Sequence, residues 1–163
     1  MAGSAISNAS SNLQRIPASA GSLIFDRAGR LLILKPNYKG GWTIPGGQID
    51  VEGESPWEAC RRETLEECGL QVEQGRLVCV DFLRPKKQRP GGVRFLFFCG
   101  AFSDERLRTI TLQSAEIDAY RFVALTEAAA LLSGPLRRRV AAAAEAKHCV
   151  YLEDGRPVPG IEG

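Results

Sequence analysis

The segment from Ser55 to Gly69 carries signals for both ends of one α-helix, and it limits the fold more than any other part of the chain. Ser55 is a preferred N-cap residue, and Pro56 suits the first helical position because proline has no N–H to leave unpaired there. Glu58, three residues after the serine, completes a capping box. Gly69 is the expected left-handed residue at the far end. The sequence therefore predicts one helix with both ends fixed.

This predicted helix has two chemically different faces. One face holds residues that recur at spacings of three and four and are expected to pack against a sheet: Trp57, Cys60, Thr64 and Cys68. Glu63, Glu66 and Glu67 lie together on another face, although like charges at these spacings repel by roughly a few tenths of a kcal/mol per pair. Arg62 is spaced to bridge Glu58 and Glu66. A helix that served only solubility would intersperse lysines, so the acidic face indicates a binding site.

The acidity is confined to one segment. Seven acidic residues and two arginines lie between Gly47 and Leu70, a net charge of −5 in a chain whose total is only +2. A concentrated acidic site on a basic body suits a metal ion that acts on an anionic substrate. Carboxylates beside the carbonyls of a glycine-rich turn form an oxygen-only environment, which favours Mg²⁺ or Mn²⁺ over Zn²⁺. Magnesium is normally shared with substrate phosphates, so a di- or polyphosphate substrate is expected.

The rest of the chain has the composition of one globular domain, with 163 residues, 44% of them hydrophobic and 25% charged. Two apolar runs joined by the turn DRAGR predict a hairpin that starts at Gly21. We expect further strands at 76–83, 93–102 and 120–125, helices at 126–132 and 135–147, and an edge strand with a turn at 150–157. Residues 1–18 are predicted to be a flexible leader, 19–157 the domain and 158–163 a tail.

Several classes of protein are excluded by what the sequence lacks. No apolar stretch approaches the roughly 18 residues of a membrane span, and the N-terminus has no secretory pattern, so a cytoplasmic location is expected. The five cysteines are odd in number and show no CxxC spacing, which argues against disulfides and a zinc site. We expect all five to be reduced core residues. His148 is expected at the surface, and Trp42 and Trp57 in the core.

The ordered string from Gly47 to Leu70 resembles the signature of the Nudix hydrolases. The residues that match in register are Glu54, Arg62, Glu63, Glu66, Glu67, Gly69 and Leu70. There are two departures: six residues instead of five separate Gly47 from Glu54, and Thr64 stands where an aliphatic residue is usual. The resemblance covers about residues 20–157. It implies an α/β fold, a Nudix-type α/β/α sandwich around a mixed β-sheet.

The resemblance also implies roles for individual residues. Glu66 and Glu67 are the foremost metal ligands, and the further ligands are the Gly46 carbonyl, Glu63, and Glu54 either directly or through water. Glu63 is alternatively the base that activates water. Family members differ over which glutamate is the base, so Glu66 is also a candidate for this role. Arg62 is expected to orient a catalytic glutamate. Glu116 is expected to supply a late acidic ligand or base, with Asp118 as a competing candidate.

The implied reaction is Mg²⁺-dependent hydrolysis of the phosphoanhydride in a nucleoside diphosphate linked to another moiety, as in nucleotide sugars, ADP-ribose or nucleoside triphosphates. The alternative is a non-catalytic nucleotide-sensing module of the same fold, against which the intact glutamates argue. An isomerase of isopentenyl diphosphate is a third reading that the cysteine placement does not favour. Family members are often dimers, so the resemblance also allows a homodimer. No membrane and no specific nucleic acid is expected as a partner.

Basic residues offer a second set of candidates. The loop 84–92 is either a solvated hairpin connection or an electropositive lip for phosphates. On the second reading, Arg84, Lys86 and Arg94 are predicted to bind substrate. The run of arginines at 137–139 on the last helix is predicted to be a solvated face.

Overall fold

The structure is a computed structural model that describes residues 14–161. The helices are α1 (Pro56–Cys68), α2 (Asp104–Leu107), α3 (Leu125–Leu131) and α4 (Gly134–Glu145). The strands are β1 (Ala18–Phe25), β2 (Leu31–Pro36), β3 (Gly46–Gln48), β4 (Arg76–Leu83), β5 (Gly92–Ala101), β6 (Ile117–Val123), β7 (Val150–Glu153) and β8 (Arg156–Pro157). None of the helices in this range has the length and apolar character needed to cross a membrane.

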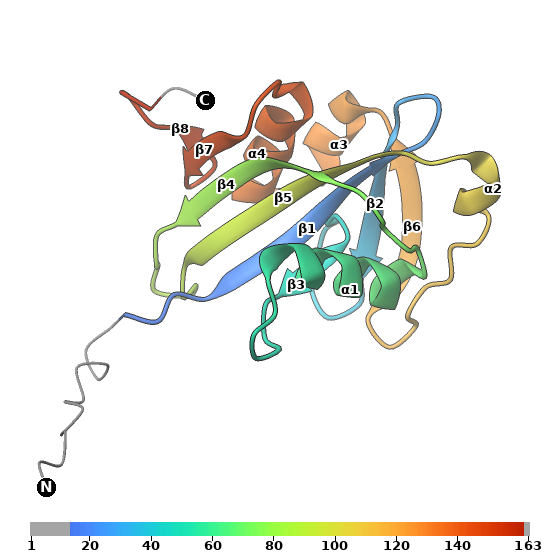
Figure 1. Ribbon diagram of the computed structural model, residues 1–163, viewed down its shortest axis with the longest axis horizontal. Helices are drawn as coiled ribbons and strands as arrows, with labels where there is room; N and C mark the ends of the chain where they lie inside the picture. The colour runs from blue at the N-terminus through green and yellow to red at the C-terminus, as the bar shows by residue number, and fades with distance from the viewer. Residues whose placement is uncertain (1–13, 162–163) are drawn as a thin grey trace, which may run out of the picture.

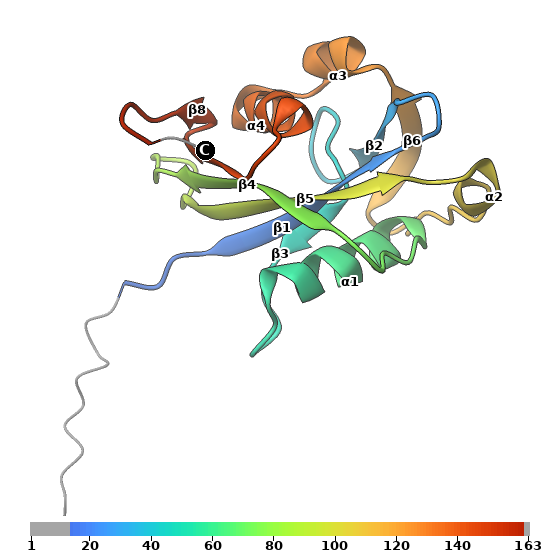
Figure 2. The same ribbon diagram turned by 45° about the horizontal axis from the view of Figure 1, so that its top comes forward.

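The strands described here form one mixed sheet of eight, in the order β6-β2-β1-β5-β4-β7-β8, with β3 paired to β1. β1 pairs antiparallel with β2 and β3 but parallel with β5. Helix α1 covers one face of the sheet, and α3 and α4 cover the other (Figure 1, Figure 2). The predicted α/β sandwich around a mixed sheet is therefore confirmed.

Each face of the sheet has its own apolar core. Along β1, Leu23 and Phe25 belong to the cluster that includes residues of α3 and α4, whereas Ile24 belongs to the cluster on the α1 side. Because both faces are covered, β1 and β2 are continuous apolar runs rather than alternating ones. A hydrogen bond of 2.9 Å between the hydroxyls of Ser22 and Thr64 fastens β1 to α1 inside this packing. Thr64 thus has a buried polar partner at a position where the Nudix signature has an aliphatic residue.

Most of the predicted elements are present, with shifted ends. The hairpin is formed by β1 and β2, and β4 spans the predicted residues 76–83. β6 starts at Ile117 rather than 120, since it pairs along the length of β2 as far as Pro36. The single turn α2 was not predicted: Ser103 caps it through a hydrogen bond from the Arg106 N–H, but four residues are too few to show helical periodicity.

The limits of the chain and the cysteines need separate comment. The leader predicted at 1–18 lies largely outside the described residues, and Ala18 is already part of β1; the domain and tail limits at 157 and 158 stay predictions. All five cysteines are free, as expected. The prediction that all five lie in the core is wrong for Cys149, which is exposed beside β7, and Cys99 is only partly buried.

Candidate active site

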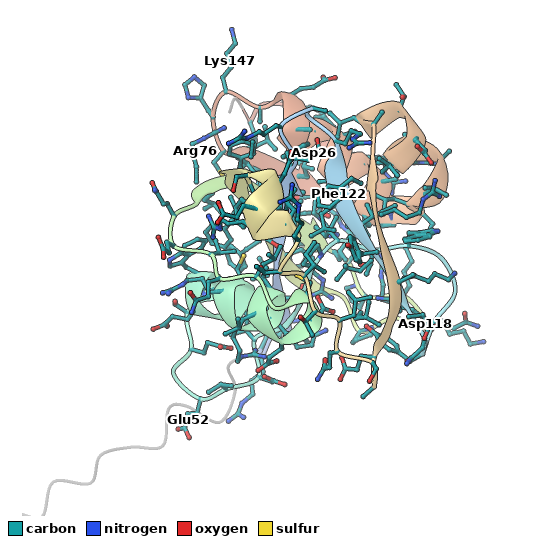
Figure 3. The ribbon with its side chains drawn as sticks, turned by 90° about the vertical axis from the view of Figure 1, so that its right-hand side faces the viewer. Asp26, Glu52, Arg76, Asp118, Phe122 and Lys147 are labelled. Atoms are coloured by element: carbon teal, nitrogen blue, oxygen red, sulfur yellow. The ribbon has the colours of Figure 1, made fainter. Side chains whose placement is uncertain are left out.

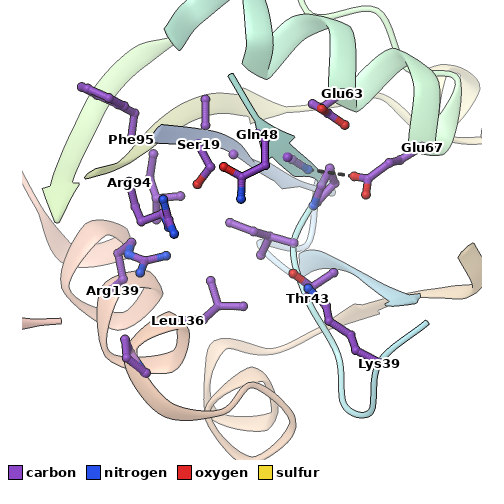
Figure 4. Close-up of a pocket in the computed structure, with 18 of the residues that line it drawn as sticks. Ser19, Lys39, Thr43, Gln48, Glu63, Glu67, Arg94, Phe95, Leu136 and Arg139 are labelled. Carbon is purple, nitrogen blue, oxygen red and sulfur yellow. Dashed lines mark hydrogen bonds between the residues drawn. The ribbon is translucent and has the colours of Figure 1, made fainter. Parts of the chain in front are cut away.

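A cavity of about 720 Å³ lies where β1, β3 and α1 meet the loop after β2, the start of β5 and the start of α4. Its two ends carry opposite charges (Figure 4). The acidic end is lined by Glu63, Glu66, Glu67 and Glu116. The basic end is lined by Arg89, Arg94 and Arg139. Three of the carboxylates come from α1 and Glu116 comes from the segment before β6. The guanidinium groups come from the β4–β5 loop, β5 and α4.

Helix α1 holds its three glutamates in place through both of its ends. The Ser55 hydroxyl accepts a hydrogen bond from the Glu58 N–H at 3.2 Å, and the Glu58 carboxylate accepts one from the Ser55 N–H at 2.8 Å. At the other end Gly69 has φ 70° and donates its N–H to the Leu65 carbonyl. The predicted capping box and left-handed end are both confirmed. The helical phase of the glutamates is thus set by local interactions.

Glu67 is the most buried of the carboxylates, with 3% of its surface exposed. Its Oε2 accepts a hydrogen bond of 2.8 Å from the main-chain N–H of Gly46 (Figure 4). Burial, aided by the charges of Glu63 and Glu116, raises the pKa of Glu67 to about 7, although the Gly46 N–H acts in the opposite direction. No lysine or arginine within residues 14–161 forms an ion pair with it. The charge of Lys39 also lowers this pKa, but it does not offset the effect of burial.

Glu63 lies where the β3 turn has no side chain. A Cβ atom at Gly47 would collide with the carboxyl group of Glu63, so only glycine leaves room for that group. At Gly46, with φ 144°, a side chain would collide with the main chain of β1 as well. Burial raises the pKa of Glu63, and Arg62 partly offsets this. The two glycines therefore allow β3 and α1 to lie close enough for the Gly46 N–H to reach the Glu67 carboxylate.

Arg62 gathers the remaining acids around one guanidinium. Its Nε and Nη2 donate to both carboxylate oxygens of Glu54 at 2.7 and 3.0 Å. Its Nη1 donates to Glu63 at 2.8 Å and to Glu66 at 3.2 Å. Glu54 and, to a lesser extent, Glu63 raise the pKa of Arg62. The expected bridge to Glu66 is present, but the one to Glu58 is not, since Glu58 is engaged in the capping box.

Not every predicted acidic residue reaches the cavity. Glu54 faces Arg62 and does not line the cavity wall, whereas Glu116 does. The main chain of Glu116 is held by the N–H of Asn37, which belongs to the loop after β2. Asp118 is exposed on the edge strand β6 and is not among the lining residues (Figure 3). Of the two competing candidates, the structure brings Glu116 to the acidic end.

The basic end differs from the sequence-based expectation. Arg94 lines the cavity as predicted, but Arg84 pairs with Glu153 and Asp154 next to β8, and Lys86 lies on the exposed β4–β5 loop. The prediction of a solvated face at 137–139 is wrong for Arg139, which is 6% exposed and donates from Nε to Asp81 at 2.9 Å. The missed signal was an aspartate inside an apolar strand, because a buried carboxylate needs a cationic partner.

A model of the NUDIX domain matches residues 15–144, which is most of the chain. The protein belongs to the Nudix hydrolase family. A search of curated proteins finds no significant match.

Solved structures of other Nudix proteins share the fold. The MutT Nudix hydrolase from Burkholderia pseudomallei is 26% identical with a TM-score of 0.62, over 82% of this chain and 99% of that one. A C. elegans Ap4A hydrolase in a binary complex is 26% identical with a TM-score of 0.52, over 69% of this chain and 84% of that one. The MutT protein from Bacillus halodurans is 21% identical with a TM-score of 0.65, over 83% and 87%, and supports the fold alone.

The extra residue in the Nudix signature is absorbed before the helix begins. The Glu54 N–H donates to the Val51 carbonyl at 3.1 Å, and Gly53 turns the chain with φ 79°. Glu52 lies exposed at this turn (Figure 3). Residues 51–54 of this turn are not among the residues that line the cavity, and the Gly46–Glu67 hydrogen bond is intact. The insertion therefore does not disturb the contact between the glycine turn and the glutamates of α1.

The donors at the acidic end fit a hard divalent cation. They are carboxylate and main-chain oxygens, and the buried Glu67 without an ion-pair partner is the position that most needs an external positive charge. Within residues 14–161 no three acidic, cysteine or histidine side chains converge as in an assembled metal site. Glu63 and Glu66 are hydrogen-bonded to Arg62 instead. A cation would compete with Arg62 for these two carboxylates.

Proposed function

We propose that this Nudix protein is a Mg²⁺- or Mn²⁺-dependent pyrophosphohydrolase that cleaves the phosphoanhydride of a nucleoside diphosphate derivative. The observation that carries the proposal is that Glu63, Glu66, Glu67 and Glu116 line one cavity, with Glu67 buried and in no ion pair with any residue of 14–161. Such a site repels phosphates unless a cation reverses its charge. The C. elegans relative is named as an Ap4A hydrolase, which supports a nucleotide substrate.

The residues of the site divide the work between binding and proton transfer. Glu66, Glu67, Glu63 and the Gly46 carbonyl are the groups that would hold the cation. When bound, the cation neutralises phosphate charge and lowers the pKa of a coordinated water. Arg62 keeps Glu63 and Glu66 close together despite their repulsion, and Glu54 anchors Arg62 through two hydrogen bonds. Glu54 therefore acts by positioning Arg62 rather than as a ligand.

Glu116 is the best-placed proton acceptor. It enters the cavity from the segment before β6, apart from α1, and within residues 14–161 no arginine or lysine pairs with its carboxylate. Glu63 and Glu66, by contrast, are both held by Arg62. A carboxylate free of such an ion pair is the better base, because an adjacent cation lowers its basicity.

The test is product release from a panel of nucleoside diphosphate derivatives, with Mg²⁺, with Mn²⁺ and with EDTA. We expect turnover that EDTA abolishes and that Glu67→Gln lowers by orders of magnitude. Glu105→Gln, at an exposed position of α2, is the control and should leave turnover unchanged. Release that neither EDTA nor Glu67→Gln affects would reject the proposal. Tight nucleotide binding without turnover would favour the non-catalytic sensing module.

A further inference from the structure

The basic end of the cavity contains a guanidinium without a carboxylate partner. Arg94, on β5, is half-buried and donates only to the main-chain carbonyls of Val93 at 3.2 Å and Gly91 at 3.1 Å. Among residues 14–161 it takes part in no ion pair. Burial, together with the nearby charges of Arg139 and Arg89, lowers the pKa of Arg94. The charge of Asp81 acts in the opposite direction, but no carboxylate in the described part of the chain pairs directly with this guanidinium.

Arg139 adds a nearly buried guanidinium to the same end. Its Nε is paired with Asp81, but its two terminal amino groups have no hydrogen-bond acceptor within the described residues. The side chains of Arg139 and Arg94 point from α4 and β5 into the cavity, across from Glu63 and Glu67 (Figure 4). A ligand in the cavity with several acceptor atoms would satisfy these donors.

Arg89 is the third guanidinium group at this end. The carboxylates that pair with the three arginines are only Asp81 and Asp154 within residues 14–161. Arg89 pairs with Asp154 at 3.2 Å, and its buried Nε has no hydrogen-bond partner in the part of the chain that the structure describes. Asp154 also pairs with Arg84, so its charge is shared. Ser133 and Leu136, at the start of α4, line the cavity as well, and the N-cap Ser133 makes no side-chain capping hydrogen bond within residues 14–161. A positive excess thus faces into the cavity.

The part of the cavity between its two charged ends suits an uncharged part of a ligand. Ser19 and Gln48 offer polar groups there, and Leu136 and Phe95 offer apolar surface (Figure 4). A ligand that spans the cavity would place an anionic group at each end and a nucleoside between them. A neutral base at the basic end would leave the arginine charges unsatisfied, whereas a phosphate monoester supplies three acceptor oxygens and a double charge.

We infer that Arg94 and Arg139, with Arg89, bind a second phosphate of the substrate, a phosphate monoester on the nucleoside that is not hydrolysed. This rests on the proposed function for the identity of the acidic end as the cleavage site. The substrate class is accordingly narrower than the family's range of nucleoside diphosphate derivatives: it comprises those whose ribose carries an additional phosphate.

The test uses ligands that contain no phosphoanhydride, so that it does not depend on turnover. Calorimetry with Mg²⁺ compares adenosine 5′-monophosphate with adenosine 2′,5′- and 3′,5′-bisphosphate, and the guanosine counterparts in the same way. We expect at least one bisphosphate to bind about tenfold more tightly or better than its matched monophosphate. Arg94→Gln should bring that ratio close to one. Arg137→Gln, at an exposed position of α4, should preserve the ratio.

Two results would overturn the inference. One is that no bisphosphate binds more tightly than its monophosphate; the other is that Arg137→Gln lowers the ratio as much as Arg94→Gln, which would indicate general attraction to a basic surface. Circular dichroism checks that each variant is folded. Arg94 is substituted instead of Arg139, because loss of Arg139 would leave the buried carboxylate of Asp81 without its partner. Absence of hydrolysis with a preserved bisphosphate preference would reject the proposed function alone.

Discussion

The carboxyl group of Glu63 occupies the place that a side chain at Gly47 would fill. Gly47→Ala should therefore displace either the glutamate or the β3 turn. We expect kcat/KM to fall about 10- to 100-fold, since a displacement near 1 Å is costly at a reacting centre. Gly40→Ala is the matched control, because nothing lies within 4 Å of its Cβ position. Equal activity of the two variants would contradict the close approach.

Burial of Glu67 links the stability of the metal-free protein to pH. Its pKa is raised to about 7 from an ordinary value of 4.5, so the folded state prefers the protonated acid. The contribution to stability is complete below about pH 4.5 and is lost as pH rises through about 7. Glu67→Gln should then raise the free energy of unfolding at pH 8 by up to about 3 kcal/mol. Denaturant unfolding in EDTA at pH 5 and pH 8 measures this, and a loss of stability at pH 8 would contradict it.

Arg62 contacts three glutamates through the fork of one guanidinium, and lysine cannot reproduce that geometry. Arg62→Lys should lower kcat by about 10²-fold even though it keeps the charge. Steady-state kinetics beside Arg61→Lys provide the comparison, since Arg61 is exposed and donates to the Val72 carbonyl. If charge alone mattered, the Arg62→Lys enzyme would retain full activity.

Glu116 and Asp118 are two residues apart but differ in access to the cavity. Glu116→Gln should lower kcat by about 10²- to 10⁴-fold, as expected for loss of a general base. Asp118→Asn should leave the rate unchanged. A rate loss in Asp118→Asn of the same size would show that the base had been assigned to the wrong acid.

Asp81 is fully buried between Arg139 and the N–H of Gly155. Arg139→Leu leaves this carboxylate without its cation and should cost about 3–5 kcal/mol of unfolding free energy. Adding Asp81→Asn should recover part of that loss, because the double variant has no unpaired buried charge. Denaturant unfolding of both, with Arg94→Gln as a near-neutral comparison, measures the coupling. Additive losses in the double variant would argue against the pair.

Elements specified by adjacent residues could be predicted from the sequence, and those specified by distant partners could not. Ser55, Glu58 and Gly69 define α1 locally, so its limits were predicted correctly. The start of β6 depends on its pairing with β2, and the burial of Arg139 depends on Asp81, which is 58 residues away along the chain. The pairing of Glu54 with Arg62 depends on a turn that brings Glu54 back toward α1, and helical spacing could predict only the bridge from Arg62 to Glu66.

The turn that absorbs the extra residue separates two structural requirements. β3 is anchored by its pairing with β1, and α1 starts where Ser55 caps it, so the connection between them is a tether with independently fixed ends. Its length can drift over evolution without rotating the glutamates about the helix axis. Residues that select a substrate can therefore be inserted into this tether while the glutamates keep their positions on α1.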